Sequence, residues 1–320
     1  MKIITEILEA INKCRTFFIA GHIKPDGDTV GSGLALASFL HRLGKKASMY
    51  SLEPVPQYLT FLNKAKTIKI MQKVPGEFDC AIILECLDLE RMGNLITAEQ
   101  AGVLINIDHH SSFSNYGHIN YIDSKASSSA ELIFNIFKQF NMPILKHEAE
   151  ALYVALVTDT GKFQQANSTP KAFRMAAELL EAGVVPTEIY GRLYATQSLP
   201  SLNLLGESLT GLKTAHFGKI AYFSITKKMY RHTHSGAADT EGIINHAMMI
   251  PEIIVGIFFR ETETPGLIKV SMRSKDHFDV NRIAKHFGGG GHKNAAGCSI
   301  KGSIRSVEKM FLTHVGKLIK

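Results

Sequence analysis

The first half of the chain alternates short apolar runs with longer segments of helical periodicity, and this alternation restricts its fold more than any other feature. We interpret three apolar runs as buried strands, at residues 16–20, 80–84 and 103–107. Segments with helical patterns surround these runs, at 5–12, 30–43, 130–140 and 147–157, with another after Pro170. Strands that alternate with helices predict an α/β domain built on a parallel sheet with flanking helices.

The second half of the chain has a different pattern, which predicts a smaller α+β unit. Its expected elements are a hairpin over 213–225, strands at 253–259 and 267–272, a helix at 279–287, a loop at 288–291 and a last helix at 304–319. We therefore predict an N-terminal domain over 1–190, a helical linker over 191–212 and a second domain over 213–320. A length of 320 residues, more than one core usually fills, agrees with two domains.

The composition of the chain limits which partners it can bind and in which compartment it is expected. A formal net charge of +7 favours anionic partners such as phosphates or nucleic acid. No apolar stretch approaches the roughly 18 residues of a membrane span, and the first twenty residues carry charges where a signal peptide needs an apolar region. The four cysteines show no C-x-x-C spacing, which suits reduced thiols. We therefore expect a cytoplasmic protein with no membrane partner.

Acidic residues and histidines directly follow each of the three apolar runs. GHIKPDGD follows the first run, LECLD the second and DHH the third. The carboxyl ends of parallel strands gather at one edge of a sheet, where ligands bind, so we expect these clusters to converge. A fourth candidate, Asp159, lies where the helix at 147–157 runs out into a Thr-Asp-Thr-Gly loop. Carboxylates with imidazoles suit a divalent cation such as manganese, with magnesium, iron or zinc as alternatives.

Each cluster by itself also has an ordinary structural explanation. The Asp-Gly-Asp at 26–28 would be a turn with solvated carboxylates, and the histidines at 109–110 would be surface or core-edge residues. Asp159 would be a helix-terminal residue in a turn. Together, however, these groups would repel or lack partners unless bound cations compensated them. Their joint placement at the ends of predicted elements therefore favours a metal site.

A glycine-rich motif, GGGGHKNAAG at 288–297, stands out in the second half. Glycines let backbone N–H groups approach an anion without obstruction, and His292 with Lys293 can add donors. No strand and helix frame the motif as the dinucleotide fingerprint G-x-G-x-x-G requires. Arg273 and Ser274, just upstream, add a guanidinium suited to phosphate. The alternatives are a flexible turn for the glycines and a solvated strand end for the arginine.

Four motifs, GHIKPDGDTVGS, IDHHSS, VTDTGKF and GGGGHKNAAG, resemble the signatures of the DHH phosphoesterase superfamily with its DHHA1 companion domain. The likeness covers essentially the whole chain. The compact length and the stretch NYIDSKASSSAE at 120–131 most resemble the branch that combines oligoribonuclease and 3'-phosphoadenosine 5'-phosphate phosphatase activities. The resemblance implies a DHH catalytic domain followed by a DHHA1 domain that binds substrate.

The resemblance also implies roles for single residues. Two divalent cations, most simply manganese, would be held by His22 and Asp26 for the first and by Asp28, His109 and Asp159 for the second. Asp108 would orient a histidine and His110 would contact the scissile phosphate. The distal phosphate or nucleoside of the substrate would be held by Arg273, Ser274, Gly289, Gly290, Gly291 and His292.

One position departs from the family pattern. The family bridges its two metals with an aspartate that closes a strand before D-x-x-R-x-G, and in ILECLDLERMG this place is taken by Glu85. Its additional methylene must be absorbed locally if the metals are to lie about 3.5–4 Å apart. Asp88 could substitute, but it lies further into the loop. We expect Glu85 to be the bridging ligand.

The implied activity is hydrolysis of phosphate esters by a water that two metals activate. Its substrates would be short oligoribonucleotides, cut to nucleoside 5'-monophosphates, and 3'-phosphoadenosine 5'-phosphate, converted to AMP. Cyclic di-AMP or its linear product pApA is an alternative substrate class, and pyrophosphate is another. A catalytically weak nucleotide-binding protein is an alternative of a different kind. A homodimer is compatible with the sequence.

Overall fold

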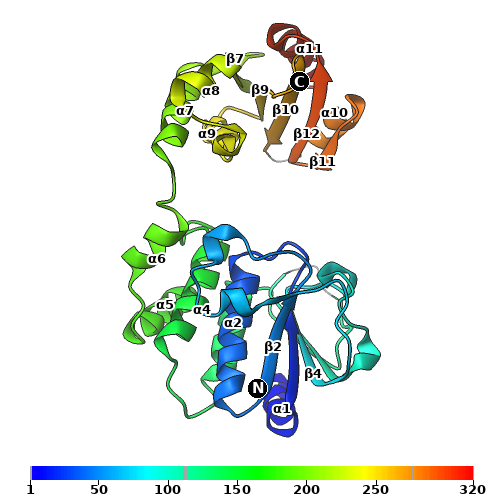
Figure 1. Cartoon of the computed structure of the whole chain (residues 1–320), viewed down its shortest axis with the longest axis vertical. Coiled ribbons are helices and arrows are strands. Elements are labelled where there is room, and N and C mark those ends of the chain that lie inside the picture. The colour runs from blue at the N-terminus through cyan, green and yellow to red at the C-terminus, as the bar shows by residue number, and fades with distance from the viewer. Residues whose placement is uncertain (1, 111–113, 276, 320) are drawn as a thin grey trace. The chain divides into compact units, whose positions relative to one another are not determined.

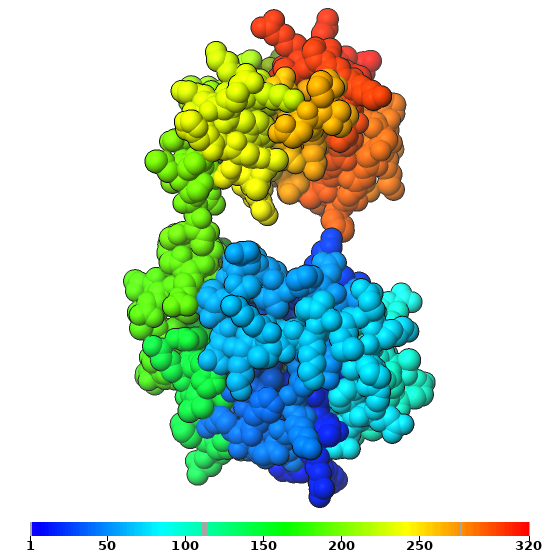
Figure 2. All heavy atoms as spheres, viewed as in Figure 1, coloured from blue at the N-terminus to red at the C-terminus, as the bar shows by residue number. Residues whose placement is uncertain are grey.

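The computed structural model describes residues 2–110, 114–275 and 277–319, so the two serines of IDHHSS lie outside the described residues. The chain divides into two compact units, Met1–Thr196 and Gln197–Lys320. Figure 1 shows the elements of each unit, and in the space-filling view side chains fill both (Figure 2). None of the helices in the described residues has the length and apolar character that spanning a bilayer requires.

A six-stranded sheet forms the centre of the first unit, with the order β3-β2-β1-β4-β5-β6 and parallel pairing throughout. Its strands are β1 (Thr16–Ala20), β2 (Lys46–Ser51), β3 (Lys69–Ile70), β4 (Phe78–Leu84), β5 (Ala101–Asp108) and β6 (Ile119–Ile122). Side chains of β1 alternate between two cores: Phe17 and Ile19 enter the larger one, and Phe18 enters the smaller. Apolar residues on both faces explain why the central strands read as continuous apolar runs.

Six α-helices accompany this sheet in the described residues (Figure 1): α1 (Lys2–Lys13), α2 (Gly27–Arg42), α3 (Ser129–Phe137), α4 (Lys146–Asp159), α5 (Pro170–Glu181) and α6 (Pro186–Leu193). Short 3-10 turns lie at Gln57–Leu59, Ala65–Thr67, Glu90–Met92 and Ala98–Gln100. Helices α2 and α4 approach closely at Gly31, where a Cβ would lie 2.3 Å from the Ala151 carbonyl oxygen. The predicted α/β fold with a parallel sheet is confirmed.

The second unit is a mixed sheet with helices, as the sequence predicted. Its strand order is β11-β12-β10-β9-β8-β7, and only β8 and β9 pair in parallel among the described strands. The strands are β7 (Lys213–Ala215), β8 (Ile220–Ile225), β9 (Val255–Glu261), β10 (Leu267–Ser274), β11 (Gly290–His292) and β12 (Ala295–Lys301). The helices are α7 (Leu199–Thr210), α8 (Lys227–Thr233), α9 (Ile243–Ala247), α10 (Val280–His286) and α11 (Ile304–Gly316), with a 3-10 turn at Ala237–Thr240.

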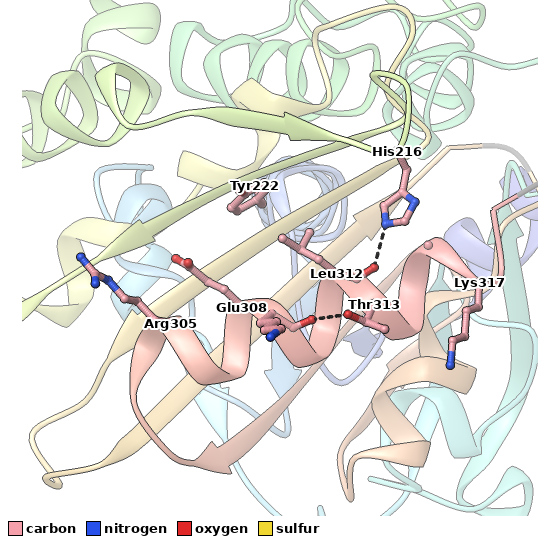
Figure 3. A pocket seen from close by; sticks show the side chains of 9 residues that line it. His216, Tyr222, Arg305, Glu308, Leu312, Thr313 and Lys317 are labelled. Carbon is pink, nitrogen blue, oxygen red and sulfur yellow. Dashed lines mark hydrogen bonds between the residues drawn. The ribbon is translucent and has the colours of Figure 1, made fainter.

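Helix α11 closes the second unit. Val307, Phe311 and Val315, spaced four residues apart, bury one face of the helix in the core. The flank of the helix lines an open hollow of about 570 Å³, and Figure 3 shows His216 pointing toward it. The Nε2 atom of His216 lies 3.0 Å from the Leu312 carbonyl oxygen.

The structure contains elements that the sequence prediction did not include, among them β2, β3, β6, β12, α8 and α9, and it differs in two further places. The predicted loop over 288–291 is wrong in its second half, because Gly290 and Gly291 belong to β11 and pair with β12. A run of glycines indicates a loop only where no neighbouring strand forms hydrogen bonds with the backbone of that run. Between the units, α6 ends at Leu193 and α7 begins at Leu199, so the stretch 191–212 contains a break between two helices.

Candidate metal centre

The polar residues that follow β1, β4 and β5 lie together with the end of α4. Three overlapping groups have their ligand atoms within 4.8 Å of one another: His22 with Asp26 and Glu85, Asp28 with His109 and Asp159, and Glu85 with His109 and His110. These groups include all six residues that the sequence suggested as metal ligands. We call the first two of these groups the two triads. Glu85 of the first triad and His109 of the second also belong to the third group, so the two triads adjoin each other.

Asp26 is fixed by the start of α2. Its backbone is extended, and its Oδ1 accepts a hydrogen bond from the Thr29 N–H at 3.0 Å, which caps the helix. Its other oxygen, Oδ2, lies 3.5 Å from His22 Nε2. Burial opposes ionisation of Asp26, but the contacts with His22 and Thr29 outweigh it and hold its pKa below the usual value. Asp26 can therefore serve as an anionic ligand.

Asp28 is buried and is held by donors from two helices. Its Oδ2 accepts the Ser129 N–H at 2.6 Å, and its Oδ1 accepts the Ala130 N–H at 3.1 Å and the Ser32 hydroxyl at 2.8 Å. The two N–H groups belong to the first turn of α3, where the helix dipole favours a negative charge. This arrangement fixes the carboxylate in one orientation.

Glu85 follows directly after β4 and is almost fully buried, at 2% exposure. Its backbone has a left-handed conformation, with φ +57, and its Oε2 accepts a hydrogen bond from the Thr29 hydroxyl. Oε2 lies 3.9 Å from His22 Nε2, whereas Oε1 lies 3.5 Å from His109 Nε2. One carboxylate oxygen therefore faces each triad. Burial and the nearby charges of Asp28 and Asp26 raise the pKa of Glu85 well above its usual value.

Asp88, the alternative to Glu85, is placed differently. Its Oδ1 accepts the Arg91 N–H at 2.9 Å, which stabilises the loop after β4. Among the described residues, Asp88 belongs to none of the three candidate metal groups. The geometry therefore favours Glu85 over Asp88 at the position between the triads.

The surroundings of His109 fit a bound cation. Its Nε2 is buried and makes no hydrogen bond within the described residues. The same atom lies 3.7 Å from Asp28 Oδ2 and 3.7 Å from Asp159 Oδ2, both too long for hydrogen bonds. Donor atoms that share a cation lie about 3–4 Å apart, because each is about 2.1 Å from the ion.

The surroundings of Asp159 also fit a bound cation. Burial, together with the charge of Asp28, raises its pKa to about 6. Buried carboxylates that repel one another around an unpaired imidazole nitrogen are costly without a compensating positive charge. The carboxylate and imidazole donors present here therefore fit divalent cations.

Asp108 and His110 form a pair beside these triads. Asp108, the buried last residue of β5, accepts through Oδ1 both the backbone N–H of His110 at 2.9 Å and its Nδ1 at 2.7 Å. This contact raises the pKa of His110 above its usual value. The His110 side chain is 47% exposed, so its ring can meet a ligand. Asp108 thus orients His110 rather than the candidate ligand His109.

The sequence did not indicate three groups that hold the candidate metal ligands in place. Thr29 contacts Glu85 and Asp26, and the first turn of α3 holds Asp28. Asn167 donates through Nδ2 to Asp159 Oδ2 at 2.9 Å and to the Ser127 carbonyl at 2.8 Å. The α3 contact had a signal, because Ser-x-x-Glu at 128–131 is typical of a helix start. The other two depend on tertiary contacts that no local pattern shows.

The residues suggested for substrate binding lie in the second unit, on neighbouring strands. Arg273 of β10 and His292 of β11 both stand opposite Ala295 of β12. The Arg273 side chain lines a hollow of about 280 Å³ with Arg260 and Ser271. Ser274 is engaged elsewhere, because its hydroxyl donates to the Phe278 carbonyl at 2.6 Å.

The glycines of the motif at 288–297 allow two strands to pack closely, as well as allowing a ligand to approach the backbone. A Cβ at Gly289 would lie 2.2 Å from the Gly297 carbonyl oxygen, and one at Gly291 would lie 2.5 Å from the Ala295 carbonyl oxygen. Gly290, in contrast, has open space where a Cβ would be. The absence of side chains at Gly289 and Gly291 is therefore required for β11 to approach β12.

The family described as "DHH family, N-terminal domain" matches residues 16–156, and the DHHA1 domain matches residues 226–320. The chain is 31% identical over 305 residues to the bifunctional oligoribonuclease and PAP phosphatase NrnA of Thermus thermophilus, covering 94% of this chain and 89% of that protein.

Solved structures show the same fold. An exopolyphosphatase-related protein from Bacteroides fragilis has a TM-score of 0.80 and 29% identity, with 99% of this chain and 97% of that chain covered. The exonuclease RecJ bound to manganese has a TM-score of 0.54 at 13% identity, with 100% of this chain and 94% of that chain covered. At that identity, the RecJ match indicates shared architecture alone.

Proposed function

Because the chain belongs to the DHH family, we propose that it is a metal-dependent hydrolase of phosphate esters. Its substrates are very short oligoribonucleotides, which it cuts to nucleoside 5'-monophosphates, and 3'-phosphoadenosine 5'-phosphate, which it converts to AMP. The observation that carries this proposal is the pair of triads with one Glu85 oxygen facing each. The similarity to an oligoribonuclease and PAP phosphatase supports the choice of substrates.

The donor set supports a site for two divalent cations. His22, Asp26 and Oε2 of Glu85 would hold one cation, and Asp28, His109 and Asp159 with Oε1 of Glu85 would hold the other. Manganese suits mixed carboxylates and imidazoles, and the structurally similar RecJ binds it. Cations bound there lower the pKa of a water molecule and stabilise the charge on phosphate oxygens.

The residues around the triads position the substrate. Asp108 occupies Nδ1 of His110, so Nε2 is the nitrogen left to meet an oxygen of the scissile phosphate. Donors prearranged in this way stabilise charge that develops in the transition state. In the second unit, Arg273, His292 and the glycine motif hold the distal phosphate or nucleoside. Ser274 acts there by fixing the turn to Phe278, because its hydroxyl is already donated.

A parallel assay tests this proposal. The purified protein with manganese is offered pAp, pApA, longer RNA, cyclic di-AMP and pyrophosphate, and the products are separated by chromatography. We expect AMP from pAp and pApA, and loss of both activities in Asp28→Ala. Asp88→Ala is the matched control, since Asp88 lies outside the triads, and it should retain turnover. Turnover of cyclic di-AMP or pyrophosphate alone would assign the enzyme a different substrate class. The absence of turnover with all five substrates would refute the proposed function.

A further inference from the structure

A cavity of about 350 Å³ lies in the first unit beside the end of α4 and helix α6. Four of its nine lining residues are aromatic, and we define the tyrosine pocket by Tyr153, Val157, Lys162, Phe163, Tyr190 and Tyr194. Its volume falls within the range of about 300–1,000 Å³ that ligand sites have. None of these residues has a part in the metal centre described above.

The rings of the pocket are placed to accept a flat ligand. Tyr190 and Tyr194 are four residues apart, and their ring centroids are 5.4 Å apart with the planes tilted by 51°. The two rings therefore do not cover each other's faces. Helix α6 is anchored by Ile189 and Leu193, both buried, which leaves Tyr190 54% exposed. Phe163 is already stacked, on Phe173 at 4.9 Å.

Lys162 adds a positive charge to this aromatic lining. Its Nζ lies 4.6 Å from the centroid of the Tyr194 ring, a cation–π contact that brings the ammonium group to the cavity. The backbone is left-handed at Gly161, Lys162 and Phe163, with φ values of +56, +62 and +61. Side chains rarely adopt this conformation, and it clusters at ligand clamps. The Lys162 N–H, which donates to the Val157 carbonyl at 2.8 Å, holds the loop in place.

The pocket lies close to the metal centre along the chain. Lys162 follows Asp159 by three residues, so their Cα atoms are at most about 11 Å apart. Val157 precedes Asp159 by two residues of the same helix, so these two side chains lie on different faces of α4, and the turn after Asp159 connects the pocket with the metal centre. The hollow along α11 is larger, about 570 Å³, but its lining rings are only His216 and Tyr222, and it belongs to the unit without the triads (Figure 3). The tyrosine pocket is thus the better match to an aromatic anion near the cleavage site.

We propose that the tyrosine pocket binds a nucleobase of a short single-stranded oligoribonucleotide, namely the base next to the nucleotide cut at the metal centre. This inference rests on the proposed function and names a subsite for it. Every base has a π face that can stack on tyrosine, so such a site is tolerant of sequence. The Lys162 ammonium meets the adjoining phosphate. The pocket therefore favours substrates with at least two nucleotides over pAp, which has a single base.

Steady-state kinetics test the proposal through the ratio of KM values for pApA and pAp. Stacking on one aromatic residue is worth about 1–3 kcal/mol per base, so Tyr190→Ala should raise this ratio roughly 5- to 150-fold. Tyr190→Phe keeps the ring and should restore the ratio. Phe217→Ala, which removes a fully exposed ring in the second unit, is the control for loss of an aromatic surface. Equal effects of Tyr190→Ala on both substrates would overturn the proposal.

A binding measurement separates failure of the pocket from failure of the proposed function. The chain has no tryptophan, so the fluorescence of a 2-aminopurine dinucleotide can be read without interference, and base stacking quenches it. Wild type should quench it and Tyr190→Ala should not. Equal quenching by both overturns the pocket. Quenching by a wild type that does not hydrolyse pApA supports the pocket while refuting the proposed function. Circular dichroism shows whether Tyr190→Ala is folded.

Discussion

The Thr29 hydroxyl donates a hydrogen bond to the Oε2 of Glu85, and both residues are buried. Thr29 also donates its backbone N–H to Asp26, so one residue orients a proposed ligand after β1 and a proposed ligand after β4. Gly21 leaves room for it, because a Cβ there would lie 2.2 Å from Thr29 Cγ2. Together with the left-handed backbone at Glu85, this contact accounts for how the longer glutamate is accommodated.

Thr29→Val removes the hydroxyl with little change of shape, and we expect it to weaken manganese binding. Loss of a group that orients a metal ligand typically costs about 10- to 100-fold in affinity. Titration calorimetry with manganese measures the effect directly. Thr29→Ser keeps the hydroxyl and should bind like wild type. If Thr29→Val bound manganese as tightly as wild type, the orienting role would be refuted.

Glu85→Gln removes a carboxyl group whose ionisation is opposed by burial and by the charges of Asp28 and Asp26. The metal-free protein should become more stable at neutral pH, on the order of 2 kcal/mol, because the amide remains neutral in the buried site without taking up a proton. Manganese should then raise the melting temperature of the variant much less than that of wild type. Thermal unfolding with EDTA and with manganese measures both effects. A variant that is less stable than wild type in EDTA would contradict this explanation.

Asp108→Asn should lower kcat while leaving manganese affinity largely intact. The carboxylate accepts both N–H groups of His110, and an amide holds that ring less firmly. The expected loss is about 10- to 100-fold, as for other orienting partners. Parallel measurement of kcat and of manganese binding separates this role from a metal ligand. Equal losses in both would assign Asp108 to the metal site instead.

Asp79 predicts a pH dependence of stability away from the metal centre. Its Oδ2 accepts the N–H groups of Arg15 at 2.8 Å and Thr16 at 2.9 Å, and these bonds lower its pKa from 3.8. A lowered pKa adds stability above the unfolded value, and this gain is lost as the pH falls through the folded value. Asp79→Asn should therefore melt below wild type at pH 7. The difference should shrink below pH 3.8, and a constant difference would contradict this assignment.

Much of the first unit could be predicted from apolar patterning, and the failures have physical causes. Strands β1 and β4 are buried on both faces, so their sequences TFFIA and FDCAIIL are recognisable without partners. Strand β6, with the sequence INYI, is only half-buried and lies at the sheet edge, so its pattern is weak. Strand β11 consists of two glycines and a histidine, and only its pairing with β12 makes it a strand.

The candidate site, like the fold, could be predicted only in part from the sequence. Residues at the ends of strands could be placed together because parallel topology brings those ends to one edge. His109, Glu85 and Asp28 therefore converge as the sequence suggested. The residues that orient them depend on contacts between distant segments: Thr29 and Glu85 are 56 positions apart, and Ser129 and Asp28 are 101 apart. No local pattern encodes such pairs.

A two-cation centre that shares Glu85 can be tested by an anomalous difference map at the manganese edge from crystals grown with manganese. We expect two peaks about 3.5–4 Å apart, with one oxygen of Glu85 on each ion. His22 and Asp26 should contact the first ion, and His109 the second. A single peak, or two peaks that Glu85 does not bridge, would rule out a shared two-cation centre.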